Sequence, residues 1–451
     1  MSHNKLADAN VGPKAMTRGS VALAAVLLVN CSTVAQSPAS SQTPISSVSP
    51  TQQAAASSCP SSAPNPSPTP LEAVATPGPV TGSIASGHWE TFTPMSVPRV
   101  FFTATFMANH EILIAGGVTD KTSAGHGLSA VEVYDPNANR DFPSPSLAMG
   151  RAGHTATLLT SGLVLIVGGY AQLGNAALNN VEVYRPGLGF SAPGSWVSAA
   201  PLKHGRTGHA AVLLADGRVL VTGGRSYPEA GTGACGAVPA TLPAEIYDPV
   251  RDMWTDAATP ALDRPVGPTA TRLKDGRVLV VGGQYMQDTP DENVERPEIY
   301  DAKSNSWSFA TPEIRAGARQ YHTATVLGDG RILYAGGSRD LRPIPYVTVY
   351  DPSSNTWTQV GSMIEPRCGH SAELLPSGDV LAVGGGCGSE PPSGTMEQYS
   401  RADNRWYPVA SMAVPRANVV TVNLDNGVIF AFGGEQHGVT NTVVEAYYSF
   451  F

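Results

Sequence analysis

Short apolar runs recur along the chain, and each run ends in a pair of glycines. Residues 219–221 precede Gly223-Gly224, and residues 278–281 precede Gly282-Gly283. An antiparallel strand with one face in water alternates apolar and polar residues, whereas these runs are apolar at every position. The pattern therefore predicts buried strands that are covered on both faces.

The glycine pairs recur at a nearly constant interval. They begin at residues 116, 168, 223, 282, 336, 384 and 433. A period of about fifty residues predicts one body of stacked repeats. This outweighs the length of 451 residues, which alone would allow several separate domains.

Each buried run is preceded by a turn and by another apolar stretch. The turn is Asp-Gly in the three clearest copies, which begin at Asp216, Asp275 and Asp329. Because Asp-Gly accepts the positive φ of a two-residue β-turn, the pattern predicts a tight antiparallel hairpin.

An arginine precedes the glycine pair by 17 residues in six copies and by 18 in the other. These arginines are Arg99, Arg151, Arg206, Arg264, Arg319, Arg367 and Arg416. In four copies a histidine follows three residues later, at His154, His209, His322 and His370.

Two further strands complete the repeat. A third strand has the form Val-Glu-Val-Tyr, as at residues 131–134 and 181–184. A fourth strand is marked by a tryptophan seven residues after the tyrosine, at Trp254, Trp307, Trp357 and Trp406. Trp196 follows its tyrosine by twelve residues, and Phe142 takes the tryptophan position in the first repeat.

This combination of arginine, glycine pair, tyrosine and tryptophan resembles the kelch repeat over residues 88–451. Residues 151–169 and 206–224 are similar to bacterial kelch proteins and to the propeller of galactose oxidase. The resemblance implies an all-β fold, a seven-bladed β-propeller whose four-stranded blades surround a central channel.

The last repeat stops before its fourth strand. Trp89 lies six residues before Met95, as Trp357 lies six before Met363. We therefore expect residues 88–93 to supply the outer strand of the seventh blade, which closes the ring and removes a free sheet edge.

Residues 1–35 have the form of an export signal. Lys14 and Arg18 precede nine apolar residues, 21–29, a run too short to cross a bilayer as a helix. Residues 28–31 resemble a lipoprotein cleavage box with Cys31 as the lipidated residue, and cleavage after Ala35 is the alternative. Both predict export to the periplasm, the cell surface or the extracellular space, and lipid at Cys31 would anchor the chain to a membrane.

Residues 36–86 consist mostly of Ser, Pro, Ala, Thr and Gln, with Glu72 as the one charged residue. Such a segment buries too little apolar surface to fold, so we expect a disordered tether before a propeller at residues 87–451. The net charge of -8 gives no sign of the basic face that nucleic-acid binding requires.

The repeated arginines and histidines are expected to be structural. Six third strands carry a glutamate two residues before the tyrosine, and the seventh carries Thr348. A repeated arginine and a repeated glutamate predict a repeated ion pair between strands. The four histidines lie in different repeats without metal-ligand spacing and are expected to pack or to form hydrogen bonds.

Arg319-Gln320-Tyr321-His322 resembles the Tyr-His pair with which galactose oxidase holds copper. That enzyme also needs a further histidine and a cysteine cross-linked to a second tyrosine. Cys368 lies in the adjacent repeat, but residues 416–419 contain no tyrosine. We therefore expect no catalytic residue, metal or cofactor.

Residues after the glycine pairs are expected on one rim of the propeller, where the kelch family binds partners. They are Tyr170, Arg225, Gln284, Tyr285, Arg339, Asp340, Glu435 and His437. The resemblance and the incomplete catalytic set favour a binding module for a protein or glycan at the cell envelope. The alternative is a carbohydrate-active enzyme, oxidase-like or epimerase-like, with its site at the channel mouth.

A two-residue turn centred between Ser377 and Gly378 would place Cys368 directly opposite Cys387. Directly opposed Cα atoms lie about 4.5–5.5 Å apart, which a disulfide can span. We predict this disulfide, and displacement of Cys387 by the extra glycine at 386 is the alternative. Cys59 and Cys235 have no assigned partners.

Overall fold

The protein is described by a computed structural model. It describes residues 87–120, 125–172, 176–187, 192–226, 242–265, 267–283, 296–311, 319–339, 342–386, 395–424 and 426–449. The predicted export signal and tether lie outside these residues. No helix that could cross a membrane is found in the described part of the chain.

Seven four-stranded antiparallel sheets form the blades, numbered here in chain order from the first strand that follows β1. Blades 1 and 2 contain β2 (Thr103–Phe106), β3 (Ile112–Ala115), β4 (Val131–Asp135), β5 (Arg140–Ser144), β6 (Thr155–Leu158), β7 (Val164–Val167), β8 (Val181–Arg185) and β9 (Ser195–Ala199). Blades 3 and 4 contain β10 (Ala210–Leu213), β11 (Val219–Thr222), β12 (Glu245–Asp248), β13 (Met253–Asp256), β14 (Thr269–Arg272), β15 (Val278–Val281), β16 (Glu298–Asp301) and β17 (Ser306–Phe309).

Blades 5 and 6 contain β18 (Thr323–Val326), β19 (Ile332–Ala335), β22 (Val347–Asp351), β23 (Thr356–Gln359), β24 (Ser371–Leu374), β25 (Val380–Val383), β26 (Met396–Ser400) and β27 (Arg405–Val409). Blade 7 contains β28 (Val420–Asn423), β29 (Ile429–Phe432), β32 (Val444–Tyr448) and β1 (His88–Phe92). Two additional hairpins are β20 (Ser338–Arg339) with β21 (Arg342–Pro343), and β30 (Glu435–Gln436) with β31 (Val439–Thr440).

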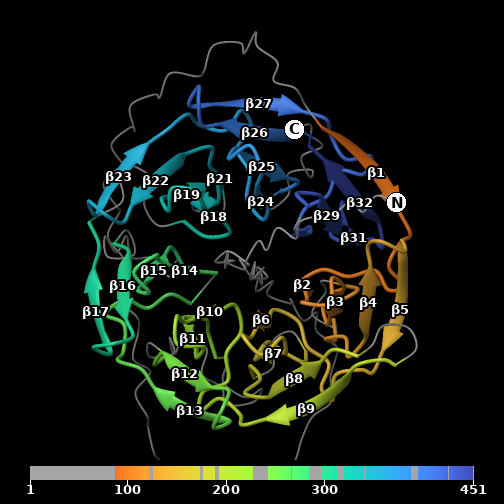
Figure 1. Ribbon diagram of the computed structural model, residues 1–451, viewed down its shortest axis with the longest axis vertical. Helices are drawn as coiled ribbons and strands as arrows, with labels where there is room; N and C mark the ends of the chain where they lie inside the picture. The colour runs from red at the N-terminus through yellow and green to blue at the C-terminus, as the bar shows by residue number, and fades with distance from the viewer. Residues whose placement is uncertain are drawn as a thin grey trace, which may run out of the picture. The chain divides into compact units, whose positions relative to one another are not determined.

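The blades form a closed ring, with the first strand of each repeat innermost and the fourth outermost (Figure 1). The fold is the predicted all-β, seven-bladed propeller. Its second strands are buried at all four positions, as their continuous apolar character requires. On β11, Leu220 packs into the core shared with blade 4, whereas Val219 and Val221 pack into the core shared with blade 2. The apolar core is therefore a ring of seams between neighbouring blades.

β1 closes the ring as predicted. It pairs with β32 in the register Trp89↔Tyr447, so the first described strand is the outer strand of the last blade (Figure 1). The indole of Trp89 also donates a hydrogen bond to the carbonyl of Ala410, which follows β27 in blade 6. Five other tryptophans make the same bond to the preceding blade, at Trp196, Trp254, Trp307, Trp357 and Trp406.

The hairpin turn between the first two strands is one residue longer than predicted. In blade 3 the Leu214 amide donates to the carbonyl of Arg218 over 2.7 Å, which leaves residues 215–217 as a three-residue loop. Gly217 has φ 86°, the left-handed conformation that completes such a loop. The prediction of a two-residue turn is wrong because Asp-Gly suits both kinds of turn, and the register between the strands shifts by one residue.

Candidate binding rim

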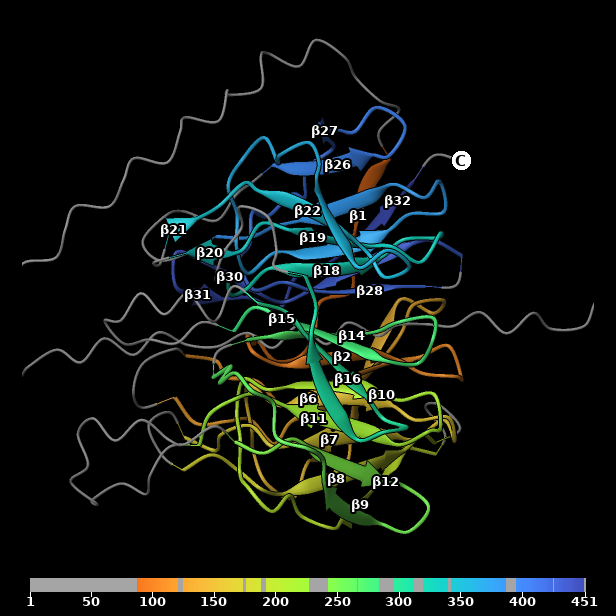
Figure 2. The same ribbon diagram turned by 90° about the vertical axis from the view of Figure 1, so that its left-hand side faces the viewer.

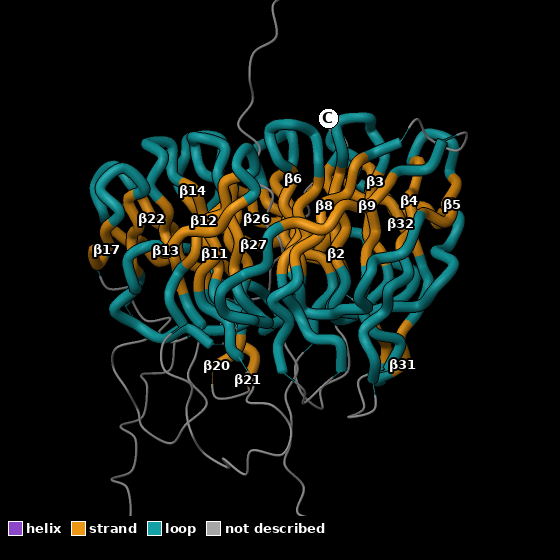
Figure 3. The backbone as a smooth tube through the Cα atoms, turned by 90° about the horizontal axis from the view of Figure 1, so that it is seen from below, coloured by secondary structure: helices purple, strands orange, loops and turns teal. Residues whose placement is uncertain are grey.

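The two rims of the propeller differ in structure. The short hairpins β20–β21 and β30–β31 extend from one rim, beyond the ends of the blade strands (Figures 2 and 3). This is the rim at which the glycine pairs end the second strands. The opposite rim carries the Asp-Gly turns, where Asp216, Asp275 and Asp329 pair with nearby arginines. We call the rim with the short hairpins the hairpin rim.

A buried arginine supports the hairpin rim in every blade. Its guanidinium donates to the carbonyl of the first glycine of the pair, over 2.6–3.3 Å across the seven blades. Six arginines also pair with a buried third-strand glutamate, as Arg151 does with Glu182 over 2.6 Å. In blade 5, Arg319 lies 3.4 Å from the hydroxyl of Thr348 instead. The structural role predicted for these arginines is confirmed.

Burial lowers the pKa of five of these arginines, and the paired glutamates oppose that shift; the five are Arg99, Arg151, Arg206, Arg264 and Arg416. For Arg416, burial outweighs the effect of Glu445 and lowers the pKa to about 10. The guanidinium therefore stays charged at neutral pH. The ion pairs are buried inside the blades, so their charges are not available to a ligand.

The four histidines join neighbouring blades. Nε2 of His154 lies 3.0 Å from the hydroxyl of Thr103 in blade 1, and the same contact recurs for His209, His322 and His370 at 2.9–3.2 Å. Burial lowers the pKa of all four and brings that of His209 and His370 to about 3. They are neutral hydrogen-bonding groups, as predicted.

A chain of backbone hydrogen bonds links the blades just inside the hairpin rim. In every blade, the residue two or three positions after the arginine has a positive φ of 53–66°. In five of the seams, the backbone amide of this residue donates to the carbonyl of its counterpart in the preceding blade, over 3.0–3.2 Å. Four of these residues are glycines, whereas Phe101, Tyr321 and Asn418 are not. Left-handed conformations of aromatic residues are costly, and such strain gathers at functional positions.

The predicted rim residues fall into two groups. Tyr170 and Glu435 belong to the hairpin rim, but their side chains are only 4% and 6% exposed. Arg225 and Arg339 are partly exposed, and His437 is exposed at the turn of β30–β31. Gln284, Tyr285 and Asp340 lie outside the described residues, so their prediction stands untested.

The short hairpins add two rim residues that the sequence did not single out, Arg342 and Val439. Arg339 stands directly opposite Arg342 across β20–β21. Val439 on β31 is 70% exposed. In blade 7 the side-chain amide of Asn418 donates to the buried carboxylate of Glu435 over 2.7 Å. Two-residue strands are too short to produce a recognisable periodic pattern, so Arg342 and Val439 carried no signal in the sequence.

Tyr321 and His322, which resemble the copper-binding pair of galactose oxidase, do not fit a copper site. His322 is fully buried, and its Nε2 is bonded to Thr269, just as three other histidines are bonded in their seams. Asn418, not a tyrosine, occupies the matching position in blade 7. Within the described ranges, no three His, Cys, Asp or Glu side chains gather as a metal site would require.

Cys368 is 3% exposed and forms a disulfide. Because the hairpin register is shifted by one residue, its backbone partner is Gly386, whose amide donates to the Cys368 carbonyl over 2.9 Å. The geometric argument for Cys387 directly opposite Cys368 is therefore wrong. Cys31, Cys59, Cys235 and Cys387 lie outside the described residues, and both the pairing of Cys368 with Cys387 and the lipidation of Cys31 remain predictions.

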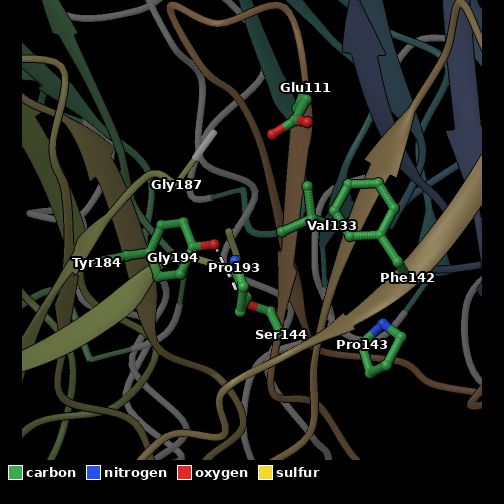
Figure 4. A pocket seen from close by; sticks show the side chains of 9 residues that line it. All are labelled: Glu111, Val133, Phe142, Pro143, Ser144, Tyr184, Gly187, Pro193 and Gly194. Atoms are coloured by element: carbon green, nitrogen blue, oxygen red, sulfur yellow. Dashed lines mark hydrogen bonds between the residues drawn. The ribbon is translucent and has the colours of Figure 1, made fainter. Parts of the chain in front are cut away.

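A small pocket opens between blades 1 and 2, beside Glu111, Phe142 and Tyr184. In five blades the third-strand tyrosine donates to an Asn or Asp five residues later. The longer loop before Trp196 removes this partner, and Figure 4 shows the Tyr184 hydroxyl directed toward Ser144 and Gly194 instead. The pocket therefore results from the insertion in blade 2.

Comparison with known proteins agrees with this architecture. The model of the Kelch motif matches residues 319–364. Kelch-like protein 23 from Pongo abelii is 27% identical over 300 residues, covering 65% of this chain and 48% of that protein. The Homo sapiens protein is 26% identical over 263 residues, covering 58% and 42%. The chain thus spans less than half the length of these relatives.

One solved structure extends the comparison to most of the ring. A fungal alcohol oxidase of the AA5 family, in complex with copper, has a TM-score of 0.64 to this chain at 16% identity. The match covers 81% of this chain and 76% of the oxidase. At that identity the likeness concerns the fold alone.

Proposed function

Because this chain is a seven-bladed propeller built of kelch repeats, we propose that it is a non-enzymatic binding module that holds a protein or glycan on its hairpin rim. Kelch propellers are typically modules for protein interaction, and the named relatives share the repeat. The oxidase supplies a likeness in fold only, so its chemistry is not carried over.

One observation supports this choice of rim over the rest of the surface. The hairpin rim is extended by β20–β21 and β30–β31, which present Arg339, Arg342, His437 and Val439 to solvent at least in part. The arginines and histidines behind them are taken up by ion pairs and seam contacts. A rim of mixed charged and apolar side chains over a rigid frame is suited to recognition.

A comparison of matched variants tests the proposal. Full-length protein carrying Arg339→Ala and Arg342→Ala is used beside a control with Arg218→Ala and Arg277→Ala on the opposite rim. Both are compared with the parent in capture from an envelope extract, with quantitative mass spectrometry of the bound material. Loss of the same bound species from the hairpin-rim variant alone supports the proposal, whereas equal retention or equal loss in both variants contradicts it.

We also propose export, with presentation away from a membrane or wall. The support is the sequence of residues 1–35 and the composition of residues 36–86. Mass spectrometry of the mature N-terminus distinguishes lipidated Cys31 from cleavage after Ala35. An unprocessed Met1 in the membrane or secreted fraction contradicts both.

The alternative function is a carbohydrate-active enzyme with its site at the channel mouth. It is supported by the left-handed conformation of Tyr321, since such strain gathers at functional positions. A metal assay and an oxidase screen of the purified protein test it. Stoichiometric copper with turnover of an alcohol or sugar would replace the binding proposal.

A further inference from the structure

The seam between blades 6 and 7 departs from the repeat at three positions of the innermost strands. The second position of these strands is alanine in six blades but Thr421 in blade 7. The third position is threonine or valine in six blades but Glu373 in blade 6. The fourth position is apolar in five blades but Asn423 in blade 7. All three substitutions introduce oxygen atoms at a single seam.

The three side chains face each other across that seam. The hydroxyl of Thr421 donates to Glu373 Oε1 over 2.6 Å. The side-chain amide of Asn423 donates over 2.8 Å to the backbone carbonyl of Leu374, the residue after Glu373. All three residues are half-buried. Because β24 and β28 are the innermost strands of their blades, this exposure lies around the axis of the ring (Figure 1).

The carboxylate of Glu373 has no cationic neighbour on the strands packed around it. β18, β24, β25 and β28, all fully described, contain no Lys, Arg or His. Glu373 is also the one titratable side chain on these four strands. Burial raises its pKa to about 7, against the hydrogen bonds from Thr421 and Asn423. An ionised carboxylate there is desolvated without a compensating charge, which is costly.

We propose that Glu373, Thr421 and Asn423 form a site on the inner wall of the ring that binds a small organic ammonium ion. A primary ammonium has three N–H donors. Glu373 offers a charged acceptor, the Thr421 oxygen keeps its lone pairs while it donates, and the Asn423 side chain has a carbonyl oxygen besides its donating amide. The cation supplies the charge that the seam lacks, through a charge-assisted hydrogen bond.

A metal ion fits this seam less well. Calcium takes six to eight oxygen ligands, as a rule with several carboxylates. The described part of the chain gathers no group of three His, Cys, Asp or Glu. The site is also separate from the hairpin rim, so it does not depend on the function proposed there.

Binding should depend on pH because the ligand requires the ionised form of Glu373. Affinity is expected to increase as pH rises through the pKa and to level off above it. A cation that binds only the folded state stabilises it increasingly as its concentration exceeds the dissociation constant, so thermal unfolding reports binding without knowledge of the natural ligand.

The experiment uses full-length protein and methylammonium chloride, with sodium chloride of equal ionic strength as the reference. Unfolding midpoints are measured at about pH 8 and about pH 5 for the parent, Glu373→Gln, Thr421→Val and the control Glu111→Gln. For the parent and the control we expect methylammonium to raise the midpoint by about 2 °C or more at the higher pH only. Glu373→Gln should show no such rise, and Thr421→Val a smaller one.

Three results would overturn the proposal. The first is equal stabilisation by sodium and methylammonium in the parent. The second is a methylammonium effect that persists in Glu373→Gln. The third comes from the same measurement in calcium chloride. A Glu373-dependent rise of the unfolding midpoint with calcium but not with methylammonium would make the site a metal site.

Discussion

Trp89 and Tyr447 face each other across β1 and β32, with ring centroids 5.3 Å apart, although they belong to opposite ends of the propeller sequence. This pair joins the first described strand to the last. The amide of Gly87 adds a hydrogen bond to the Tyr447 hydroxyl over 2.9 Å. Blade 7 therefore depends on both ends of the propeller sequence.

Deletion of residues 87–95 should leave β32 as an unpaired edge. We expect the deleted protein to aggregate or to melt well below the parent, because the outer strand and the Trp89 contact with Ala410 are both lost. Differential scanning calorimetry with light scattering measures both outcomes. An unchanged melting temperature would show that β1 does not close the ring.

Arg206→Ala should destabilise the protein by about 3–5 kcal/mol, because it leaves the fully buried Glu245 without its partner. Arg225→Ala and Arg339→Ala remove partly exposed side chains and should change stability by no more than about 0.5 kcal/mol. Urea unfolding compares the three variants. Equal losses in all three would contradict the division between buried frame and exposed rim.

Non-reducing peptide mapping should recover Cys368 joined to Cys387. Closing a short loop in this way should contribute about 3 kcal/mol by the chain-entropy estimate. Alkylation of both cysteines in oxidised, exported protein would rule out this pair. A peptide joining Cys368 to Cys59 or Cys235 would assign the disulfide differently.

The buried histidines should make the protein sensitive to acid. Their pKa lies below the unfolded value of 6.5 and is about 3 for His209 and His370. Between these pH values only the unfolded chain takes up the proton. The contribution of these histidines to stability is therefore complete above pH 6.5 and falls as the pH drops. The loss is about 1.4 kcal/mol per pH unit for each histidine.

Urea unfolding across this pH range checks the slope. His209→Gln should reduce it, whereas His437→Gln on the exposed turn should leave it unchanged. A slope unaffected by His209→Gln would mean that this side chain is not held neutral by burial.

The contribution of Glu373 to stability should depend on pH in the direction opposite to that of the histidines, and Glu373→Gln removes it. The folded pKa of Glu373 is about 7, above the usual 4.5, so its contribution is complete below pH 4.5 and is lost as pH rises to 7. The glutamine variant should therefore exceed the parent at neutral pH by on the order of 1–3 kcal/mol and should not gain at pH 4. Chemical unfolding in the absence of amines measures this difference. A variant less stable at neutral pH would contradict the burial of an uncompensated charge.

The repeat made most of the frame predictable. The offset from Arg206 to Gly223, and the offsets from Glu245 to Tyr247 and Trp254, recur in most blades and specify a strand order, because each residue type serves one recurring contact. The loop length was not specified in the same way, since Asp-Gly occurs in both two-residue and three-residue turns. One residue of register decided which residue faces Cys368.

The candidate rim was less predictable. Position after a glycine pair indicates the correct rim, but it does not say whether a side chain points outward, and Tyr170 and Glu435 point into the protein. The left-handed conformation of Phe101 and Tyr321 is imposed by the seams and not by local preference. The tyrosine partners Asn139 and Asn305 could have been found, since each follows its tyrosine by five residues.

The backbone hydrogen bonds just inside the hairpin rim join the blades through main-chain atoms, whatever side chains the blades carry there. Gly153 and Gly369 use only main-chain atoms to join their neighbours. A Cβ at Gly153 would lie 2.8 Å from the Thr207 hydroxyl, whereas at Gly369 the nearest atom is Asn418 Oδ1 at 3.0 Å, so a side chain at position 369 needs only a small shift of its neighbour. The positive φ restricts replacements chiefly to glycine, asparagine and aspartate. Exchanges among these three at position 369 would let a mutagenesis library alter this part of the rim while the scaffold stays assembled.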